Sequence, residues 1–347
     1  MKLSHSAVAK YSMCPKAYEY HYKQRIRSVV QSGALAFGSA LDAALNVLLS
    51  GKDGAEDAFT TAFTTQTIND KEEHLPTCPR LVYADADFDE ELVSFSADDL
   101  VRFYNIRSKK KAIGWIFLPK EDKEFYNKMN WESMRIKGML MLKAYREKVL
   151  PKLTKVHTIQ SEINLSNGNN DVVTGFVDLV ADYEGYGTVI FDNKTAGRRY
   201  EQDAVITSPQ LSLYMHALES TFNTRKAGYI VMIKNVMKNR KKICSSCSHD
   251  GSGSRAKSCD NVINGKRCGG EWKESIHPDI DVQILIDEIP SVTEQIVIDN
   301  YDTVCRAVAA DIFPRNFNTC DNVYGGPCVY RDLCFKDSMK GLVKKDD

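Results

Sequence analysis

The sequence predicts an α/β protein whose strand-rich core is wrapped by helices from both ends of the chain. Two observations carry this prediction. Runs of β-branched and aromatic residues cluster between residues 157 and 234, and the segments on either side repeat their apolar residues at helical spacing. With 347 residues, the chain can form one large domain or two modest ones around a full hydrophobic core.

The first 150 residues are predicted to be largely helical. A helix over residues 4–24 begins at Ser4 or Ser6 as its N-cap, and its tyrosines recur at helical spacing. A second helix, rich in Ala and Leu, spans residues 31–50 and ends at Gly51. Three further helices are expected over residues 56–71, 97–107 and 121–148.

The rest of the chain alternates strands and helices. Turn-rich residues 182–187 separate two apolar runs, which are therefore expected to form a hairpin. Residues 243–271 are rich in Ser, Gly and Cys and interrupt the pattern as an insert, and a loop-rich tail with cysteines closes the chain. Strands are expected over residues 157–165, 172–182, 188–193 and 227–234, and helices over residues 203–222 and 281–309.

The overall charge gives no sign of a nucleic-acid partner, because 46 Lys and Arg balance 46 Asp and Glu. Any such surface must come from local asymmetry. The sequence has no Gly-x4-Gly-Lys-Ser/Thr loop, so nothing suggests an ATP-driven motor. Short basic runs, each more often a solvated face than a binding stripe, lie at residues 109–111, 198–199 and 238–242.

The chain is expected to be cytoplasmic, with no membrane partner. No stretch approaches the roughly 18 apolar residues of a membrane span. The N-terminus also lacks the apolar core of a signal peptide. In that compartment the ten cysteines are expected to include metal ligands rather than a disulfide framework.

Two acidic residues and a lysine lie on the predicted hairpin. Asp178 is on its first strand, and Asp192-Asn193-Lys194 ends its second strand. Pairing of the strands brings the two carboxylates close in space. Two carboxylates beside an ammonium form a hard-cation site next to an electrostatic clamp, which is what phosphodiester hydrolysis needs. Three solvated charges on exposed strands are the alternative interpretation.

An ordered series of short motifs runs through nearly the whole chain. The motifs are Leu3-Ser4, Cys14-Pro15 with Tyr18, Phe37-Gly38-Ser39-Ala40, Gly175-Phe176-Val177-Asp178, Asp192-Asn193-Lys194-Thr195 and Gln210-Leu211-Ser212-Leu213-Tyr214. With this series the sequence resembles the PD-(D/E)XK nuclease superfamily, in particular its RecB-like branch of phage recombination exonucleases and CRISPR adaptation nucleases. The resemblance implies a restriction-endonuclease-like core, with a central mixed sheet flanked by helices.

The resemblance also implies the catalytic roles. Asp178 and Asp192 would bind Mg²⁺ or Mn²⁺, with the Asn193 carbonyl as a further ligand. Lys194 would position or activate the attacking water and stabilise the transition state. The family usually has a histidine where this chain has Asp42. As a hard oxygen donor Asp42 can also bind the metal, and a helix-surface acid is the alternative interpretation.

Three further residues are candidates for the catalytic site. Gln210 and Tyr214 are four residues apart on one predicted helix, so they share a face and are expected to support the strand end and contact DNA. An ordinary polar edge of an amphipathic helix is the alternative for this pair. Glu162, on the preceding strand, would supply a further acid or be a solvated strand charge.

Eight of the cysteines form two sets. The first set lies in the insert, with the spacing of a tetrahedral Zn²⁺ site in a segment too polar to form its own core. The second set is linked only by the resemblance, which implies a [4Fe–4S] cluster on one N-terminal and three C-terminal cysteines. The zinc ligands would be Cys244, Cys247, Cys259 and Cys268, and the cluster ligands Cys14, Cys320, Cys328 and Cys334.

The resulting expectation is a metal-dependent DNA exonuclease that acts in recombination, repair or phage DNA processing. Its partners would be DNA ends and a recombination or replication protein. A CRISPR-adaptation-type nuclease and a non-catalytic, metal-scaffolded DNA-binding adaptor are the alternatives. The expected parts are a helical N-terminal region, a nuclease core, a zinc insert near the active site and an iron–sulfur tail, over residues 1–150, 151–242 with 272–310, 243–271 and 311–347.

Overall fold

The structure is a computed structural model of the chain. The predicted helix over residues 97–107, the basic run 109–111 and the part of the predicted helix 56–71 after residue 63 lie outside its described residues. Within the described residues, no helix is both long enough and apolar enough to cross a membrane. The described residues are 2–28, 33–63, 120–166, 172–251, 254–321 and 327–345.

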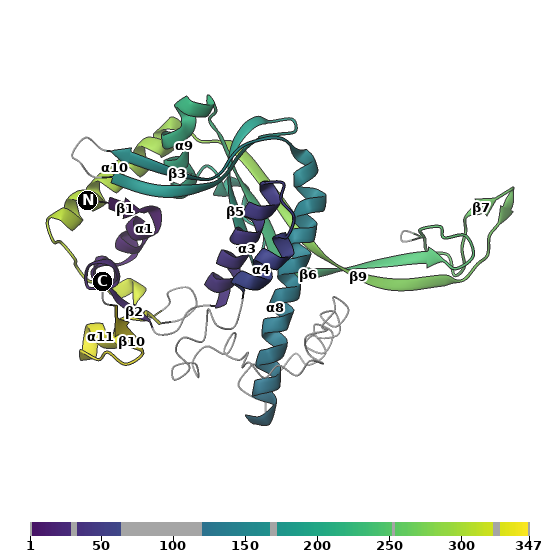
Figure 1. Cartoon of the computed structure of the whole chain (residues 1–347), viewed down its shortest axis with the longest axis horizontal. Coiled ribbons are helices and arrows are strands. Elements are labelled where there is room, and N and C mark those ends of the chain that lie inside the picture. The colour runs from purple at the N-terminus through teal and green to yellow at the C-terminus, as the bar shows by residue number, and fades with distance from the viewer. Residues whose placement is uncertain are drawn as a thin grey trace.

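A mixed sheet of six strands lies at the centre of the molecule, as the sequence predicts (Figure 1). Its order is β1-β4-β5-β6-β9, and β3 pairs with the other edge of β4. The pairs β3–β4, β4–β5 and β6–β9 are antiparallel, whereas β1–β4 and β5–β6 are parallel. The strands are β1 (Lys2–Ser4), β3 (Leu153–Ser166), β4 (Val172–Tyr183), β5 (Gly187–Ala196), β6 (Lys226–Cys244) and β9 (Trp272–Glu288).

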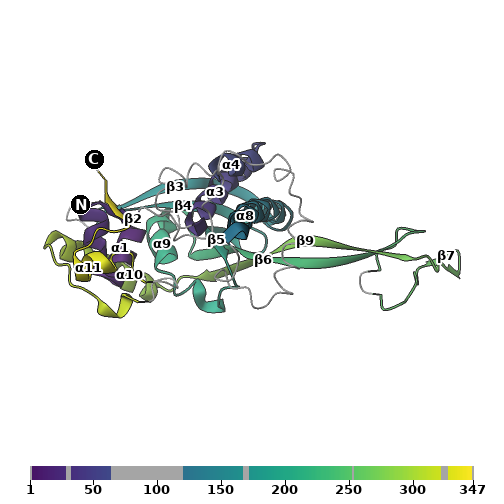
Figure 2. The same ribbon diagram turned by 90° about the horizontal axis from the view of Figure 1, so that it is seen from below.

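Helices cover both faces of this sheet (Figures 1 and 2). Strand β5 is apolar on both faces for this reason: Val189 and Phe191 pack in the core under one helical layer, and Ile190 packs under the other. The first layer contains α3 (Gly33–Leu49), α4 (Ala55–Ala62) and α8 (Lys120–Lys148), and the second contains α1 (His5–Met13), α9 (Pro209–Phe222) and α10 (Ser291–Ala309).

Strands β4 and β5 separate just before the predicted catalytic residues. Their last pair in this direction is Leu179 with Phe191. Beyond it β5 continues in parallel register with β6, while the start of β4 pairs with β1 instead. Asp178 and Asp192 therefore lie at the point where the two strands part, which leaves room for side chains between them.

The predicted helix over residues 281–309 is wrong in its first part. Residues up to Glu288 belong to strand β9, and α10 begins only at Ser291. The strand has an alternating apolar pattern, because Ile280 is buried and Val282, Ile284 and Ile286 pack against the same core. Antiparallel pairing with β6 along its whole length fixes this segment as a strand.

The N-terminal helix predicted over residues 4–24 is broken at Cys14. Cys14 is extended because it precedes Pro15, and α2 (Pro15–Tyr18) and a π-helical turn follow it. The chain then forms β2 (Ile26–Ser28), which pairs with β10 (Leu342–Lys344) near the other end of the chain. The two ends of the protein are thereby joined next to α11 (Arg331–Lys336).

Strands β6 and β9 continue past the body of the protein as a two-stranded ribbon, which Figures 1 and 2 show projecting alone. We call residues 236–280 the arm and residues 244–272 its tip. A register shift after Met232 marks where the arm begins. The tip contains β7 (Val262–Ile263) and β8 (Lys266–Arg267). The expectation that the cysteine insert lies near the active site is therefore wrong, because the extended β6 carries it outward.

Candidate active site and cysteine clusters

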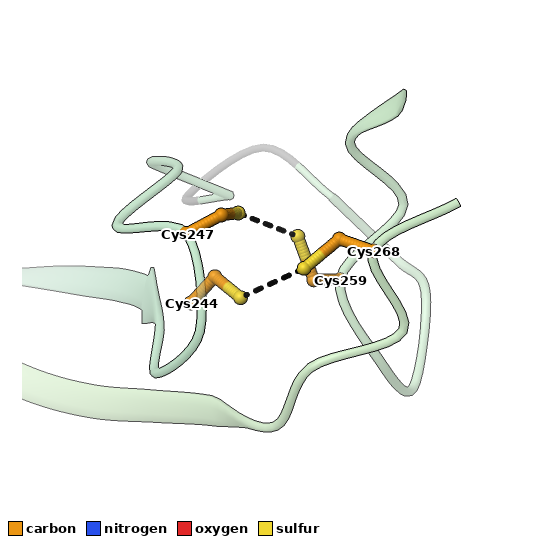
Figure 3. Close-up of side chains that lie close together, drawn as sticks. All are labelled: Cys244, Cys247, Cys259 and Cys268. Carbon is orange, nitrogen blue, oxygen red and sulfur yellow. Dashed lines mark hydrogen bonds between the residues drawn. The ribbon is translucent and has the colours of Figure 1, made fainter. Parts of the chain in front are cut away.

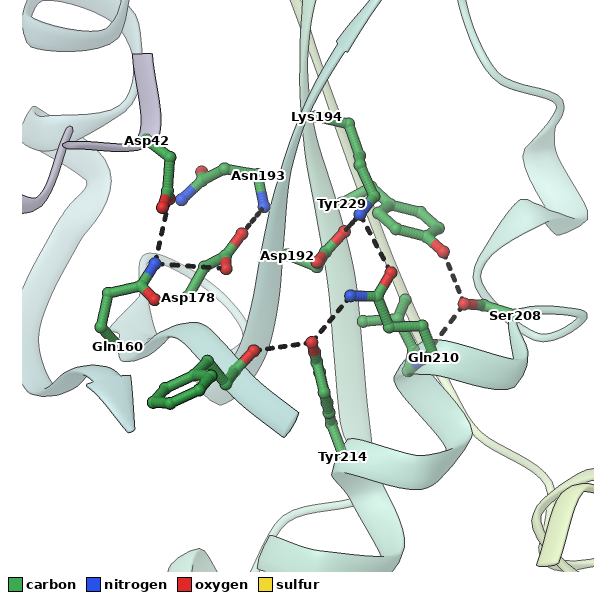
Figure 4. A network of polar contacts seen from close by, with 12 residues as sticks. Asp42, Gln160, Asp178, Asp192, Asn193, Lys194, Ser208, Gln210, Tyr214 and Tyr229 are labelled. Atoms are coloured by element: carbon green, nitrogen blue, oxygen red, sulfur yellow. Dashed lines mark hydrogen bonds and ion pairs between the residues drawn. The ribbon is translucent and has the colours of Figure 1, made fainter. Parts of the chain in front are cut away.

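A cleft of about 510 Å³ opens where β4 and β5 separate, between α3 and α9. Figure 4 shows its polar side chains directed toward one another, from α3, β3, β4, β5 and α9. Seven of the eight residues predicted for catalysis or Mg²⁺/Mn²⁺ binding line this cleft. They are Asp42, Asp178, Asp192, Asn193, Lys194, Gln210 and Tyr214.

Asp178 is fixed by the backbone of the neighbouring strand. The Asn193 backbone N–H donates to Asp178 Oδ2 at 2.7 Å, across the gap where the strands no longer pair. The Asn193 side chain accepts a hydrogen bond from the buried hydroxyl of Tyr145, at 3.3 Å. These contacts hold both residues in place. They use Asp178 Oδ2, and the other carboxylate oxygen, Oδ1, lies near Gln160.

Lys194 is oriented by the first turns of α9. Its Nζ donates to Gln210 Oε1 at 2.9 Å, and Gln210 Nε2 donates to the Tyr214 hydroxyl at 2.7 Å. Tyr214 in turn donates to the Phe176 carbonyl on β4 at 2.6 Å. Gln210 and Tyr214 share one helix face, as predicted, and tie the lysine to the strand that carries Asp178. The helix is positioned by Ser208, whose Oγ caps Leu211 N at 3.1 Å.

Gln160 is a site residue that the sequence did not reveal. Its Nε2 donates to Asp42 Oδ1 at 3.0 Å and lies 3.4 Å from Asp178 Oδ1. It lies between two residues that pair on either side of Asp178, and its φ of 50° is left-handed, a conformation that costs a non-glycine residue about 1 kcal/mol. The position of Gln160 opposite Asp178 follows from the register of β3 against β4, which the sequence alone does not specify.

The structure does not bring Glu162 to the cleft. This residue pairs with Phe176 two positions further along β3, and its side chain is exposed. Its Oε1 accepts from Asn164 and Thr174 at 3.3 and 3.5 Å. Gln160, not Glu162, is therefore the β3 side chain beside the carboxylates.

The three cleft carboxylates share an environment that disfavours their charged form. Burial, together with the nearby charge of Asp178, raises the pKa of Asp42 to about 6. Burial also raises the pKa of Asp178 and of Asp192. Burial lowers the pKa of Lys194, but its ion pair with Asp192 outweighs this and the pKa is raised overall. One ammonium faces three carboxylates, so the ionised site lacks positive charge.

The side chains of the cleft are of the kind that binds a hard divalent cation, although among the described residues only the four insert cysteines have their ligand atoms all within 4.8 Å of one another. Asp192 is only 1% exposed, and its Oδ2 has no hydrogen-bond partner among the described residues. Lys194 Nζ lies 2.5 Å from this oxygen as an ion pair but without hydrogen-bond geometry. An oxygen-only set of Asp42, Asp178 and Asp192 is what Mg²⁺ or Mn²⁺ prefers, and a cation would supply the missing charge.

Gln160→Leu is expected to weaken Mn²⁺ binding by about 10- to 100-fold, the usual effect of losing a group that orients metal ligands. The substitution removes the amide that holds Asp42 beside Asp178. Calorimetric titration with Mn²⁺ measures the change. Glu162→Gln is the matched control on the same strand, since Glu162 does not line the cleft, and equal losses in both variants would contradict the assignment.

The four insert cysteines meet at the tip of the arm, as the sequence predicts (Figure 3). All four Sγ atoms lie within 4.8 Å of one another, and the pairs Cys244–Cys268 and Cys247–Cys259 are 3.6 Å apart. A tetrahedral Zn²⁺ site with Zn–S bonds of about 2.3 Å has S···S edges of about 3.8 Å. The arrangement therefore fits a single four-coordinate metal ion.

The backbone around these thiols is folded tightly. A Cβ at Gly270 would lie 2.7 Å from Cys244 Sγ, so only glycine fits there without a shift. Gly270 and Gly269 also exchange backbone hydrogen bonds with Cys259, at 2.8 and 2.9 Å. The Trp272 Nε1 donates to the Ala256 carbonyl at 3.0 Å and packs against the loop.

Cys247→Ser is expected to reduce the bound zinc from one equivalent to less than about 0.1, since structural sites need all four ligands for tight binding. Zinc released by acid and measured colorimetrically tests this. Cys305→Ser, at a buried cysteine of α10, should keep its zinc. Zinc-free wild-type protein purified without chelators would contradict the expectation.

The second cysteine set is also brought together in space. Cys14 lies at the N-cap of α2, and Cys334 is on α11. The Cys328 N–H donates to the Cys320 carbonyl at 2.9 Å. Burial raises the pKa of Cys328, and the thiols of Cys14, Cys320 and Cys334 raise it further. These cysteines adjoin a small apolar cluster of Ala17, Tyr20, Ile26 and Tyr330.

The chain thus has an α/β fold with a central mixed sheet flanked by helices, and its cleft gathers three carboxylates and a lysine. The chain matches the PD-(D/E)XK nuclease superfamily over residues 2–335 and belongs to that family. Nucleases of this superfamily use divalent metals. No curated protein matches the chain.

Proposed function

We propose that the protein is a Mg²⁺- or Mn²⁺-dependent deoxyribonuclease, and that it acts as an exonuclease in DNA recombination, repair or phage DNA processing. One observation supports this above all. One buried and two half-buried carboxylates line one cleft together with a lysine, from α3, β4 and β5, and the ammonium pairs with the buried Asp192. This set of groups is the one that metal-assisted phosphodiester hydrolysis requires.

In this proposal Asp42, Asp178 and Asp192 would hold the cation. The bound metal would polarise the phosphodiester and lower the pKa of a water molecule. Lys194 is held by Asp192 and Gln210. An ammonium has three N–H donors, so Lys194 would use another to orient the attacking water or to stabilise charge on the phosphoryl oxygens.

The intact site favours a nuclease over the non-catalytic adaptor. The cleft raises the pKa of all three carboxyl groups, so their ionised forms destabilise the metal-free fold. A protein that had lost nuclease activity would have no reason to keep them. A CRISPR-adaptation-type nuclease shares the same chemistry and differs in its partner proteins.

We also propose a [4Fe–4S] cluster on Cys14, Cys320, Cys328 and Cys334, and Zn²⁺ at the arm tip. The cluster would join α2 to the C-terminal segment, which also meet through the β2–β10 pair. The cluster would close a very long loop, and a cross-link restricts the unfolded chain most when the loop that it closes is long. Its role would be structural.

Cleavage of end-labelled DNA during a metal titration tests the catalytic proposal. Protein dialysed against EDTA should bind DNA without cutting it, and added Mg²⁺ or Mn²⁺ should restore cutting. Zinc content is measured in parallel, so that loss of the tip metal is not mistaken for loss of the catalytic metal. Undiminished cutting in EDTA would contradict the proposal, and binding without cutting at every metal concentration would favour the adaptor.

A further inference from the structure

The arm concentrates positive charge in a chain whose net charge is zero. Residues 236–280 contain nine Lys and Arg against five Asp and Glu, whereas the rest of the chain contains 37 against 41. The arm is thus the basic part of an otherwise acidic protein. Electrostatic attraction of a polyanion is therefore expected at the arm and not over the body of the protein.

The arm places this charge far from the cleft. Met232 lines the cleft, and β6 continues from it to Cys244 in register with β9 except for one irregularity. From Met232 to Cys244 strand β6 advances 12 residues while the paired stretch of β9 advances 10, so at about 3.3 Å per residue the span is about 33 to 40 Å. B-DNA rises about 3.4 Å per base pair, so this distance corresponds to roughly 10 to 12 base pairs.

The tip is built as a rigid platform. Trp272 packs against Gly251, where a Cβ would lie 2.2 Å from the ring, and Lys242 Nζ lies 5.4 Å above the same ring. Asn264 and Gly265 form the left-handed turn between β7 and β8. The exposed basic residues of this platform and of the adjoining strand are Arg255, Lys257, Lys266, Arg267 and Lys273.

We propose that the arm tip binds the backbone of duplex DNA about one helical turn from the cleavage site, so that tight binding requires a minimum duplex length. The inference rests on the proposed DNA nuclease function and adds to it a second, remote contact. Lysine and arginine contacts to phosphates position a protein without reading sequence. The contact would therefore be general for DNA and sensitive to salt.

Protein docking is the competing use of the tip. Val262 and Ile263 of β7 are 64% and 44% exposed and would suit an apolar partner surface. The excess of basic residues in the arm favours DNA as the occupant. The experiment separates the two, because a phosphate contact depends on salt and on the basic side chains, and an apolar contact does not.

The test measures affinity for duplexes of 8 to 32 base pairs by fluorescence anisotropy, without divalent metal so that no cleavage occurs. The tip variant carries Lys257→Gln, Lys266→Gln, Arg267→Gln and Lys273→Gln and keeps all four cysteines, so its zinc content should equal that of the wild type. The control variant makes the same change at four exposed basic residues of the body: Lys52, Lys143, Arg306 and Lys340.

The wild type and the control should bind on the order of 10-fold more tightly once the duplex exceeds roughly 12 base pairs, and the tip variant should show no such step. The slope of log affinity against log salt on long duplexes should fall by about 3 to 4 in the tip variant, as expected for four lost phosphate contacts. Equal length dependence and equal slopes in the wild type and the tip variant would overturn the inference.

A further variant, Val262→Ser with Ile263→Ser, should leave DNA binding unchanged. Loss of the length step in this variant, with a normal salt slope, would overturn the phosphate contact in favour of an apolar one. Cleavage is assayed separately with Mg²⁺ on the longest duplex. A wild type that shows the length step but no cleavage would count against the proposed nuclease and not against the arm contact.

Discussion

Asp192→Asn is expected to reduce DNA cleavage by at least about 10²-fold, the usual cost of removing a group that stabilises charge in a hydrolytic site. The same substitution should raise the melting temperature of the metal-free protein by a few degrees, on the order expected for about 1 kcal/mol. Asp192 is buried and its pKa is raised even with Lys194 beside it, so a neutral side chain of the same shape suits the empty cleft better.

The stability effect has a defined dependence on pH. The pKa of Asp42 rises from 3.8 to about 6 on folding, and those of Asp178 and Asp192 also rise. The native state therefore binds more protons than the unfolded state, and the metal-free protein loses stability as the pH increases from about 4 through 7, since the pKa of Asp192 is raised to about 7. Asp192→Asn should flatten this loss.

Melting curves with and without Mn²⁺, between pH 4 and 8, measure both effects. Lys194→Met is the matched variant, because it should abolish cleavage while keeping the three carboxylates that are proposed to bind the metal. Mn²⁺ should raise the melting temperature of Lys194→Met and fail to raise that of Asp192→Asn. Near-wild-type cleavage by purified Asp192→Asn protein would refute the site.

Cys14→Ser is expected to have the largest effect on stability. Anaerobically purified wild-type protein should be brown, with the broad visible absorption of a thiolate-bound iron–sulfur cluster, and the variant should be colourless and poorly soluble. The proposed cluster closes a loop of about 300 residues, for which the loop-entropy argument gives on the order of 4 kcal/mol or more.

Iron and sulfide analysis, visible spectra and melting curves of the two proteins test this expectation. Cys305→Ala is the control, because Cys305 is buried in α10 and is not one of the four proposed ligands, so the colour should be unchanged. Wild-type protein that contains neither iron nor sulfide after anaerobic purification would reduce the four residues to structural thiols.

The core of the site was predictable because its signals are local. Asp178 and Asp192 lie in apolar runs separated by a short turn, so strand pairing alone predicts that they meet. The i, i+4 spacing of Gln210 and Tyr214 likewise predicts a shared helix face. In the structure this face holds Lys194.

The misplaced features depend on contacts between distant segments. The position of Gln160 beside the carboxylates depends on the β3–β4 register and a left-handed residue, neither of which has a local sequence signature. The first part of the predicted helix over residues 281–309 is a strand because β6 pairs with it. The reach of the arm depends on β6 continuing well past residue 234, through a basic stretch whose composition suggests a loop.

The linkage of Cys14 to the tail was likewise beyond local reasoning. More than 300 residues separate Cys14 from Cys320, and only the resemblance joined them. In the structure the β2–β10 pair and the burial of Tyr330 against Ala17 and Tyr20 bring the two segments together. Long-range packing of this kind leaves no periodic pattern in the sequence.

The central claim, a metal-dependent DNA exonuclease, is tested most directly by a time course on end-labelled linear and closed circular DNA with Mg²⁺ or Mn²⁺. Lys194→Met serves as the catalytic control. The account predicts progressive loss of linear DNA from its ends, no change in the closed circle and no products from the variant. Equal cutting of the circle would contradict exonuclease action, and intact linear DNA at every metal concentration would contradict the nuclease itself.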